Sequence, residues 1–293
     1  MKILLPLDGS PLSESTLPFG RALARRWQAE VALVRVSDPG LSVAPDLPEK
    51  VRAVMQQRSL AAAGEYLAHL EATFTDVPVI SHQPLGRPRE EIARLADQLA
   101  CDLIIMAFHG RTGPDRWLLG SVAEGVLRRS HCPVLLLHPP ASDVAEFRNV
   151  LVPVDGSPDS LRAFQRIIPY LAPTGKVTLL QCTGLDGEQL GPEEDSAYLE
   201  LIASQMLEVK VDGLQPEVVV LHGRPAQTIL DWASSHGCDL IAMSTHGRTG
   251  AAGLWLGSVT EKVARTAPCP VLAIPGGHAN TQPGGLDDRL HPD

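Results

Sequence analysis

Short apolar runs alternate with stretches of helical periodicity along nearly the whole chain. In the first half the apolar runs predict strands at 2–7, 31–36, 77–80, 103–107 and 134–137. Apolar residues three and four positions apart predict the helices between them, at 12–28, 49–73, 88–99 and 122–129. The second half follows the same order. This alternation is typical of parallel strands that helices cover on both faces.

Sequence motifs of the first half recur in the second. Pro-x-Asp-Gly-Ser-Pro begins at Pro6 and again at Pro153, Cys-Asp-Leu-Ile begins at Cys101 and Cys238, and a longer glycine-containing motif is repeated as well. A repeat of this length is a whole domain and exceeds a solenoid unit. We therefore predict two tandem Rossmann-like α/β domains, each a five-stranded parallel sheet with helices on both faces. The expected division is 1–138 and 149–275 for the domains, 139–148 for the linker and 276–293 for a disordered tail.

The net charge and the cysteine pattern indicate which partners and which cellular compartment to expect. Lys and Arg number 25 and Asp and Glu number 34, so the formal net charge is −9. Nucleic acids and anionic membranes attract positive surfaces, so neither is an expected partner. The five cysteines form no CxxC pair, and no apolar run reaches the roughly 18 residues of a membrane span. These features predict a cytoplasmic protein.

The loop after the first strand of each half reads Asp-Gly-Ser-Pro, at 8–11 and 155–158. Serine is a favourable helix N-cap, and proline fits the first helical position, so a turn explains these residue types. The turn does not explain Asp8 and Asp155, which end their strands where ligands bind in parallel sheets. Ligand contact is the preferred interpretation, and a turn role alone is the alternative.

The loop after the fourth strand carries the longest matched motif, His-Gly-Arg-Thr-Gly at 109–113 and 246–250, followed by Gly-Ser-Val at 120–122 and 257–259. Glycines allow a close approach of the backbone, and arginine is a forked cation that suits phosphate. Ser followed three residues later by Glu predicts a capping box at Ser121 and Ser258. Together with a helix N-terminus, these features predict a phosphate site. The alternative is a loop that only turns the chain and caps a helix. The motif is neither a Walker A loop nor the dinucleotide fingerprint.

These motifs resemble the universal stress protein family in its tandem two-domain form. The ATP-binding members of that family carry Gly-x2-Gly-x9-Gly-[Ser/Thr]. Here the second and third glycines and the nine-residue spacer are present in both halves, whereas Ala107 and Ser244 replace the first glycine. The resemblance implies an adenine contact at each strand-one aspartate, backbone contacts at the end of strand two, and pairing of 134–137 with 271–274 within the chain.

The resemblance and the loop motifs together give one nucleotide site in each half. The expected site residues are Asp8, Val36, Ala107, Gly110, Arg111, Gly120, Ser121 and Val122 in the first half, and Asp155, Cys182, Ser244, Gly247, Arg248, Gly257, Ser258 and Val259 in the second.

The function expected from these sites is ATP-dependent regulation in the stress response, with little or no turnover. Mg²⁺ would arrive on the ATP phosphates, because the histidines and cysteines have no metal-ligand spacing. His109 and His246 lack a neighbouring carboxylate or nucleophile, so no catalytic residue is assigned. A slow ATP hydrolase or nucleotidyl-transfer enzyme and a nucleotide-free scaffold remain alternatives. A protein partner and a homodimer are left open.

Overall fold

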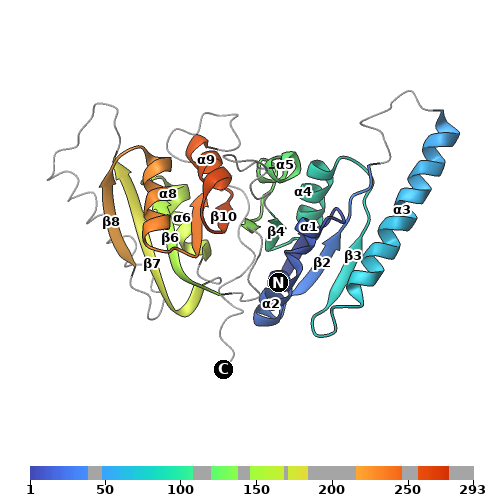
Figure 1. Cartoon of the computed structure of the whole chain (residues 1–293), viewed down its shortest axis with the longest axis horizontal. Helices are drawn as coiled ribbons and strands as arrows, with labels where there is room; N and C mark the ends of the chain where they lie inside the picture. Colours follow the sequence, from blue (N-terminus) through green and yellow to red (C-terminus); the bar gives the residue numbers. More distant parts are fainter. Residues whose placement is uncertain are drawn as a thin grey trace.

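The computed structural model describes residues 1–38, 48–107, 120–137, 146–167, 171–183, 216–245 and 257–276. Within these residues one ten-stranded sheet runs through the molecule in the order β3-β2-β1-β4-β5-β10-β9-β6-β7-β8 (Figure 1). The first-half strands are β1 (Lys2–Pro6), β2 (Glu30–Val34), β3 (Val79–His82), β4 (Leu103–Ala107) and β5 (Val134–Leu137). The second-half strands are β6 (Phe147–Val154), β7 (Leu171–Thr183), β8 (Glu217–His222), β9 (Leu240–Ser244) and β10 (Val271–Ile274).

All neighbouring strands within a half are parallel, and the two halves meet antiparallel at β5 and β10. Leu135 pairs with Leu272 at this junction, and both side chains are fully buried. The predicted fold class is confirmed, and so is the pairing of the last strands. The junction leaves β3 and β8 as the outer edges of the sheet.

Helices cover both faces of the sheet. They are α1 (Pro11–Glu14), α2 (Leu17–Trp27), α3 (Glu49–Glu71), α4 (Pro88–Gln98), α5 (Ser121–Leu127), α6 (Pro158–Ile167), α8 (Pro225–Ser235) and α9 (Ser258–Thr266). Leu23 of α2 and Leu67 of α3 share a core with Ile3, whereas Ile92 of α4 packs on the opposite face with Leu4. Neighbouring residues of one strand therefore serve opposite faces, which explains why the strands are continuously apolar.

The segment predicted as one helix at 12–28 is two helices. Pro18 lies in the first turn of α2 and cannot donate a backbone hydrogen bond. The Oγ of Ser15 donates to the carbonyl oxygen of Leu12 at 2.6 Å, and the Oγ1 of Thr16 donates to that of Ser13 at 2.8 Å. These side chains satisfy carbonyls at the break, so the prediction of a continuous helix was wrong.

Contacts between the halves extend beyond the paired strands. The rings of Phe19 and Phe147 lie 5.8 Å apart between centroids, and Arg265 of α9 pairs with Glu124 of α5 at 3.4 Å. One buried cluster contains residues of α2, α3 and α6 together with strands of both halves. The two tandem domains therefore share a core. Residues 139–145 of the predicted linker and 277–293 of the predicted tail lie outside the described residues, whereas 147–148 of the predicted linker belong to β6.

Candidate functional site

Three predicted site residues lie together where strands β1, β2 and β4 end. They are Asp8, Val36 and Ala107. Pro6 pairs with Val34, and the N–H of Leu7 donates to the Val34 carbonyl at 2.8 Å, so this register places Asp8 beside Val36. In the β1–β4 pairing Leu4 lies opposite Ile104. Continued to the ends of the two strands, this register places Asp8 opposite the residue after Ala107.

The second half repeats this arrangement. Val154 pairs with Gln181, which places Asp155 beside Cys182, and the β6–β9 register places Asp155 one position beyond Ser244. The parallel strands of the two halves run in opposite directions, because β5 and β10 pair antiparallel. The carboxyl ends of the first-half strands therefore lie on the opposite side of the ten-stranded sheet from those of the second-half strands. The chain therefore presents two separate candidate sites, each at the point where strand order reverses within its half.

The turn after β1 is organised by Asp8 as well as by Ser10. Asp8 Oδ1 accepts from the N–H of Ser10 at 2.9 Å, and Ser10 Oγ accepts from the N–H of Ser13 at 3.1 Å. Gly9 between them has φ of +85°, a conformation that favours glycine. The predicted N-cap at Ser10 is confirmed, and Asp8 has the role in the turn that the sequence analysis kept as an alternative.

The equivalent turn after β6 has the same hydrogen bonds. Asp155 Oδ1 accepts from the N–H of Ser157 at 3.0 Å, and Ser157 Oγ accepts from the N–H of Ser160 at 3.2 Å. Gly156 has φ of +77°. The two aspartates are therefore held in equivalent turns after β1 and β6.

Asp8 gives the turn a pH dependence. Partial burial opposes its charge, but hydrogen bonds from Ser10 and Ser13 outweigh that burial and hold the pKa of Asp8 below its ordinary 3.8. A lowered folded pKa gives stability that is present above about pH 4 and lost as the pH falls through the folded value.

We expect Asp8→Asn, which keeps the acceptor oxygen and removes the charge, to be slightly less stable than the parent chain at pH 7. The difference should shrink at pH 3, because below about pH 4 the unfolded chain binds a proton at Asp8 more readily than the folded chain does, and the stability from its charge is progressively lost. Urea unfolding of both chains at the two pH values measures it. A difference that is the same at both values would show that the charge of Asp8 does not stabilise the turn.

The capping-box prediction requires Ser121 and Ser258 to be helix N-caps. In the structure each helix begins one residue earlier than that. Gly120 and Gly257 are the N-caps, and Ser121 and Ser258 are the first helical residues. Glu124 accepts instead from Arg128 one turn later, at 2.9 Å, and Glu261 accepts from Arg265 in the same way. The predicted capping boxes were therefore wrong.

Among the described residues, no side chain caps the N-terminus of α5 or α9. Helix starts of this kind carry unpaired N–H groups and a partial positive charge, which suit an anion.

The second half shows how the glycine loop is anchored. The N–H of Gly257 donates to the carbonyl oxygen of Thr245 at 2.8 Å, and the buried Thr260 Oγ1 donates to that of Ser244 at 2.9 Å. These bonds join the end of β9 to the start of α9. Gly110, Arg111, Gly247 and Arg248 lie outside the described residues, as do His109 and His246.

The Cys-Asp-Leu-Ile motif has a structural role that sequence reasoning missed. Asp102 Oδ2 accepts from the N–H of Lys2 at 2.6 Å, and Asp239 accepts from the N–H groups of Arg148 and Asn149 at 2.8 and 3.0 Å. Each aspartate thus fixes the first strand of its half beside the fourth. The repetition of this motif was the available signal.

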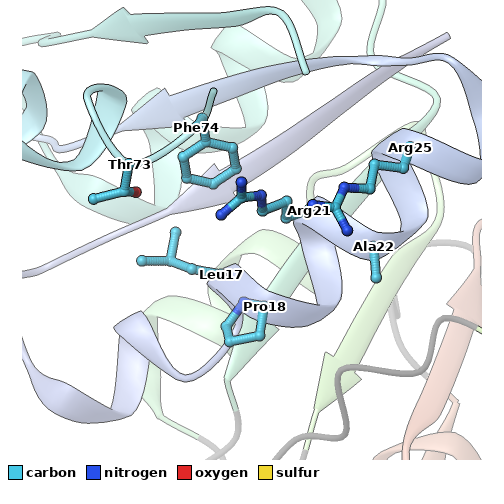
Figure 2. Close-up of a pocket in the computed structure, with 7 residues that line it drawn as sticks. All are labelled: Leu17, Pro18, Arg21, Ala22, Arg25, Thr73 and Phe74. Carbon is cyan, nitrogen blue, oxygen red and sulfur yellow. The ribbon is translucent and has the colours of Figure 1, made fainter. Parts of the chain in front are cut away.

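A cavity of about 360 Å³ lies away from both sheet edges, between α2 and the end of α3 (Figure 2). Its lining residues are Leu17, Pro18, Arg21, Ala22, Arg25, Thr73 and Phe74. Arg21 pairs with Asp76 at 2.6 Å, and Arg25 pairs with the same carboxylate. These ion pairs join α2 to the segment before β3, so the cavity has a structural explanation and no link to the predicted sites.

Cysteine chemistry and metal binding find no support in the part of the chain that is described. All five cysteines are free, and burial raises the pKa of Cys101 and Cys269 to about 12 and that of Cys132 to about 11. Such thiols remain protonated and unreactive at neutral pH. Among the residues described, no group of three or more metal-ligating side chains occurs, and no helix is long and apolar enough to cross a membrane.

Comparison with known proteins identifies the family. The model of the universal stress protein family matches residues 1–138 and 146–275. The chain is 28% identical to universal stress protein Rv2623 of Mycobacterium tuberculosis over 287 residues, covering 92% of this chain and 95% of the relative. It is 34% identical to universal stress protein MJ0531 of Methanocaldococcus jannaschii over 145 residues, covering 48% of this chain and 84% of the relative.

A solved structure supports the same relationship. The crystal structure of a universal stress protein from Archaeoglobus fulgidus matches with a TM-score of 0.71 and 25% identity, covering 94% of this chain and 98% of the other. The likeness extends over both halves, so it includes the tandem arrangement.

Proposed function

Because the chain belongs to the universal stress protein family, we propose that it is an ATP-binding regulatory protein of the stress response with one nucleotide site in each half. The adenine end would lie near Asp8 and Val36 in the first half and near Asp155 and Cys182 in the second. The phosphates would lie on the glycine loop and the helix start after the fourth strand. The remaining proposed contacts are Ala107, Gly110, Arg111, Gly120, Ser121, Val122, Ser244, Gly247, Arg248, Gly257, Ser258 and Val259.

One observation carries this proposal. In each half, an aspartate after the first strand, the end of the second strand and the end of the fourth strand meet at one sheet edge. The helix after the glycine loop begins at a glycine with no side-chain cap among the described residues. That combination provides a polar contact for the base and N–H donors for the phosphates.

The charge of the chain determines what must hold the phosphates. The formal net charge of −9 opposes a polyanionic ligand, and a helix start contributes only about 0.3–1 kcal/mol. Several donors must therefore act together. We assign them to the N–H groups at Ser121 and Val122, or Ser258 and Val259, with the loop arginine. Mg²⁺ bound to the phosphates would supply further positive charge.

The replacements of the first motif glycine are compatible with binding. Ala107 ends β4 and Ser244 ends β9, both in extended backbone that does not require glycine. Both side chains are small, so close approach of a nucleotide remains open. The two replacements are therefore no reason to prefer the nucleotide-free scaffold.

We expect ATP turnover to be slow. Phosphate release at saturating MgATP should fall well below the roughly 10 per second of a median enzyme. Turnover should be slow because no nucleophile or general base is assigned to either site. A malachite-green or coupled assay measures the release. Turnover on the enzyme scale would favour the ATP hydrolase instead.

The proposal includes a cytoplasmic location and a protein partner that reads the nucleotide state. It also places the domain limits at 1–138 and 149–275.

A further inference from the structure

The helices that follow the two glycine loops, α5 and α9, lie side by side at the junction between the halves (Figure 1). Ala264 of α9 is fully buried, and it belongs to the same apolar cluster as Val126 and Leu127 of α5. Although α9 is part of the second half, one of its residues therefore packs in the core of the first. This contact brings the next residue, Arg265, within reach of α5.

Four charged side chains, two from each half, form a continuous series of ion pairs at this contact. Glu124 Oε1 accepts from Nη2 of Arg128 at 2.9 Å, and Glu124 Oε2 accepts from Nη2 of Arg265 at 3.4 Å. The same Nη2 of Arg265 donates to Oε1 of Glu261 at 2.9 Å. Glu124 of the first half thus lies between an arginine of its own helix and an arginine of the other half.

The carboxylate of Glu124 has an alternative to these ion pairs. It lies three residues after Ser121, the spacing at which a glutamate can reach back to a backbone N–H of a helix start. The proposed function assigns the N–H groups of Ser121 and Val122 to the phosphates. A carboxylate turned toward them would compete for those donors and would repel the phosphates. The pairs with Arg128 and Arg265 hold the carboxylate in a different arrangement.

We propose that Arg265 of the second half is a positioning residue for the first nucleotide site. It acts through Glu124, whose carboxylate it holds away from the backbone that receives the phosphates, and it makes no direct contact with the nucleotide. This inference rests on the proposed function. It also gives the tandem arrangement a role, because the first half then reaches its full affinity for a polyphosphate only when it is joined to the second.

The expected effect is several-fold. The side chains of Arg265 and Glu124 are 31% and 28% exposed, so water and salt screen the pair. Arg128 remains in place when Arg265 is removed, and it continues to hold Glu124 in part.

The experiment measures the first site alone in the full chain. Gly247→Val disables the second site, and calorimetric titration of that chain with MgATP and with adenosine gives the two affinities. Arg265→Gln in this background should weaken MgATP binding about two- to fivefold at low salt. Adenosine has no phosphate, so its affinity should stay the same. The loss for MgATP should shrink as the salt concentration rises.

Glu124→Ala tests whether Arg265 acts through this carboxylate. Without a carboxylate there is nothing to hold away from the helix start, so Arg265→Gln should then change MgATP affinity by less than about 1.5-fold. Glu124→Ala by itself should keep or strengthen MgATP binding. This variant also tests the proposal if Arg265→Gln proves unfolded by circular dichroism, because weaker MgATP binding in folded Glu124→Ala would overturn it.

Two further variants separate the ion pair from the charge of α9. Arg265→Lys keeps a cation that can pair with Glu124, so it should retain most of the MgATP affinity. Lys262→Gln removes the same charge three residues earlier on the same helix and should leave MgATP affinity unchanged. An equal loss in Lys262→Gln and Arg265→Gln would mean that only the net charge of α9 matters, which overturns the role of Arg265.

The remaining failures are distinguishable. MgATP affinity that is unaffected by Arg265→Gln, or reduced as much with Glu124→Ala as without it, overturns this inference and leaves the proposed function in place. An equal loss for adenosine also overturns it, because Arg265 would then only support the fold. Absence of ATP binding in the unmodified chain overturns the proposed function together with this inference.

Discussion

Replacing both Gly110 and Gly247 by valine is expected to abolish ATP binding while the chain stays folded. These glycines occupy the second position of the repeated loop motif, and a branched side chain there would block close approach of the backbone to a phosphate. We expect calorimetry to show a loss of at least about a hundredfold in affinity. Circular dichroism and the urea midpoint should remain close to those of the unmodified chain.

A matched control lies in the same loops. The double variant Thr112→Val and Thr249→Val also introduces valine, two residues after each glycine. It replaces a side chain of similar size and leaves the glycines in place. This variant should keep most of the affinity. If the folded glycine variant binds ATP as tightly as the control, the glycine loops do not hold the phosphates.

The second large effect concerns the junction between the halves. Leu272 of β10 pairs directly with Leu135 of β5, and neither side chain is exposed. Leu272→Ala removes buried methyl groups and leaves a cavity, so we expect the free energy of unfolding to fall by about 2–5 kcal/mol. Urea unfolding followed by circular dichroism measures the change.

The edge strand β3 provides the comparison. Ile80→Ala shortens a β-branched residue that is 47% exposed at the far end of the sheet and should cost far less. Equal costs for the two variants would mean that the junction is not a packed core in solution.

Local patterns in the sequence were sufficient to predict most of the fold. Continuous apolar runs identify the strands because helices cover both faces, and the Ser10-Pro11 pair marks the start of the first helix. The pairing of 134–137 with 271–274 came from the family resemblance and not from the pattern, because the sequence does not specify which strands of two domains meet. The antiparallel direction of that pairing is a finding of the structure.

The errors arose where two local interactions compete. Ser121 and Glu124 have the spacing of a capping box, but Glu124 also has Arg128 four residues later, and that ion pair is the one formed. Gly120 is itself an acceptable N-cap, so Ser121 becomes the first helical residue and not the cap. Similarly, Pro18 divides a segment whose apolar spacing alone predicts one continuous helix.

Other features depend on packing between distant segments. Arg265 is near Glu124 only because α9 and α5 come together at the junction of the halves, and no local signal distinguishes this arginine from a surface residue. The role of Asp102 at the start of β1 depends on the pairing of β1 with β4 in the same way. The loop residues themselves remain predictions from the motif.

The most direct measurement is the nucleotide content of the purified chain. The protein would be denatured after purification without added nucleotide, and the released small molecules identified and quantified by mass spectrometry, then measured again after saturation with MgATP and gel filtration. The account predicts ATP as the bound species, approaching two per chain after saturation. A chain that carries no adenine nucleotide under either condition would contradict it.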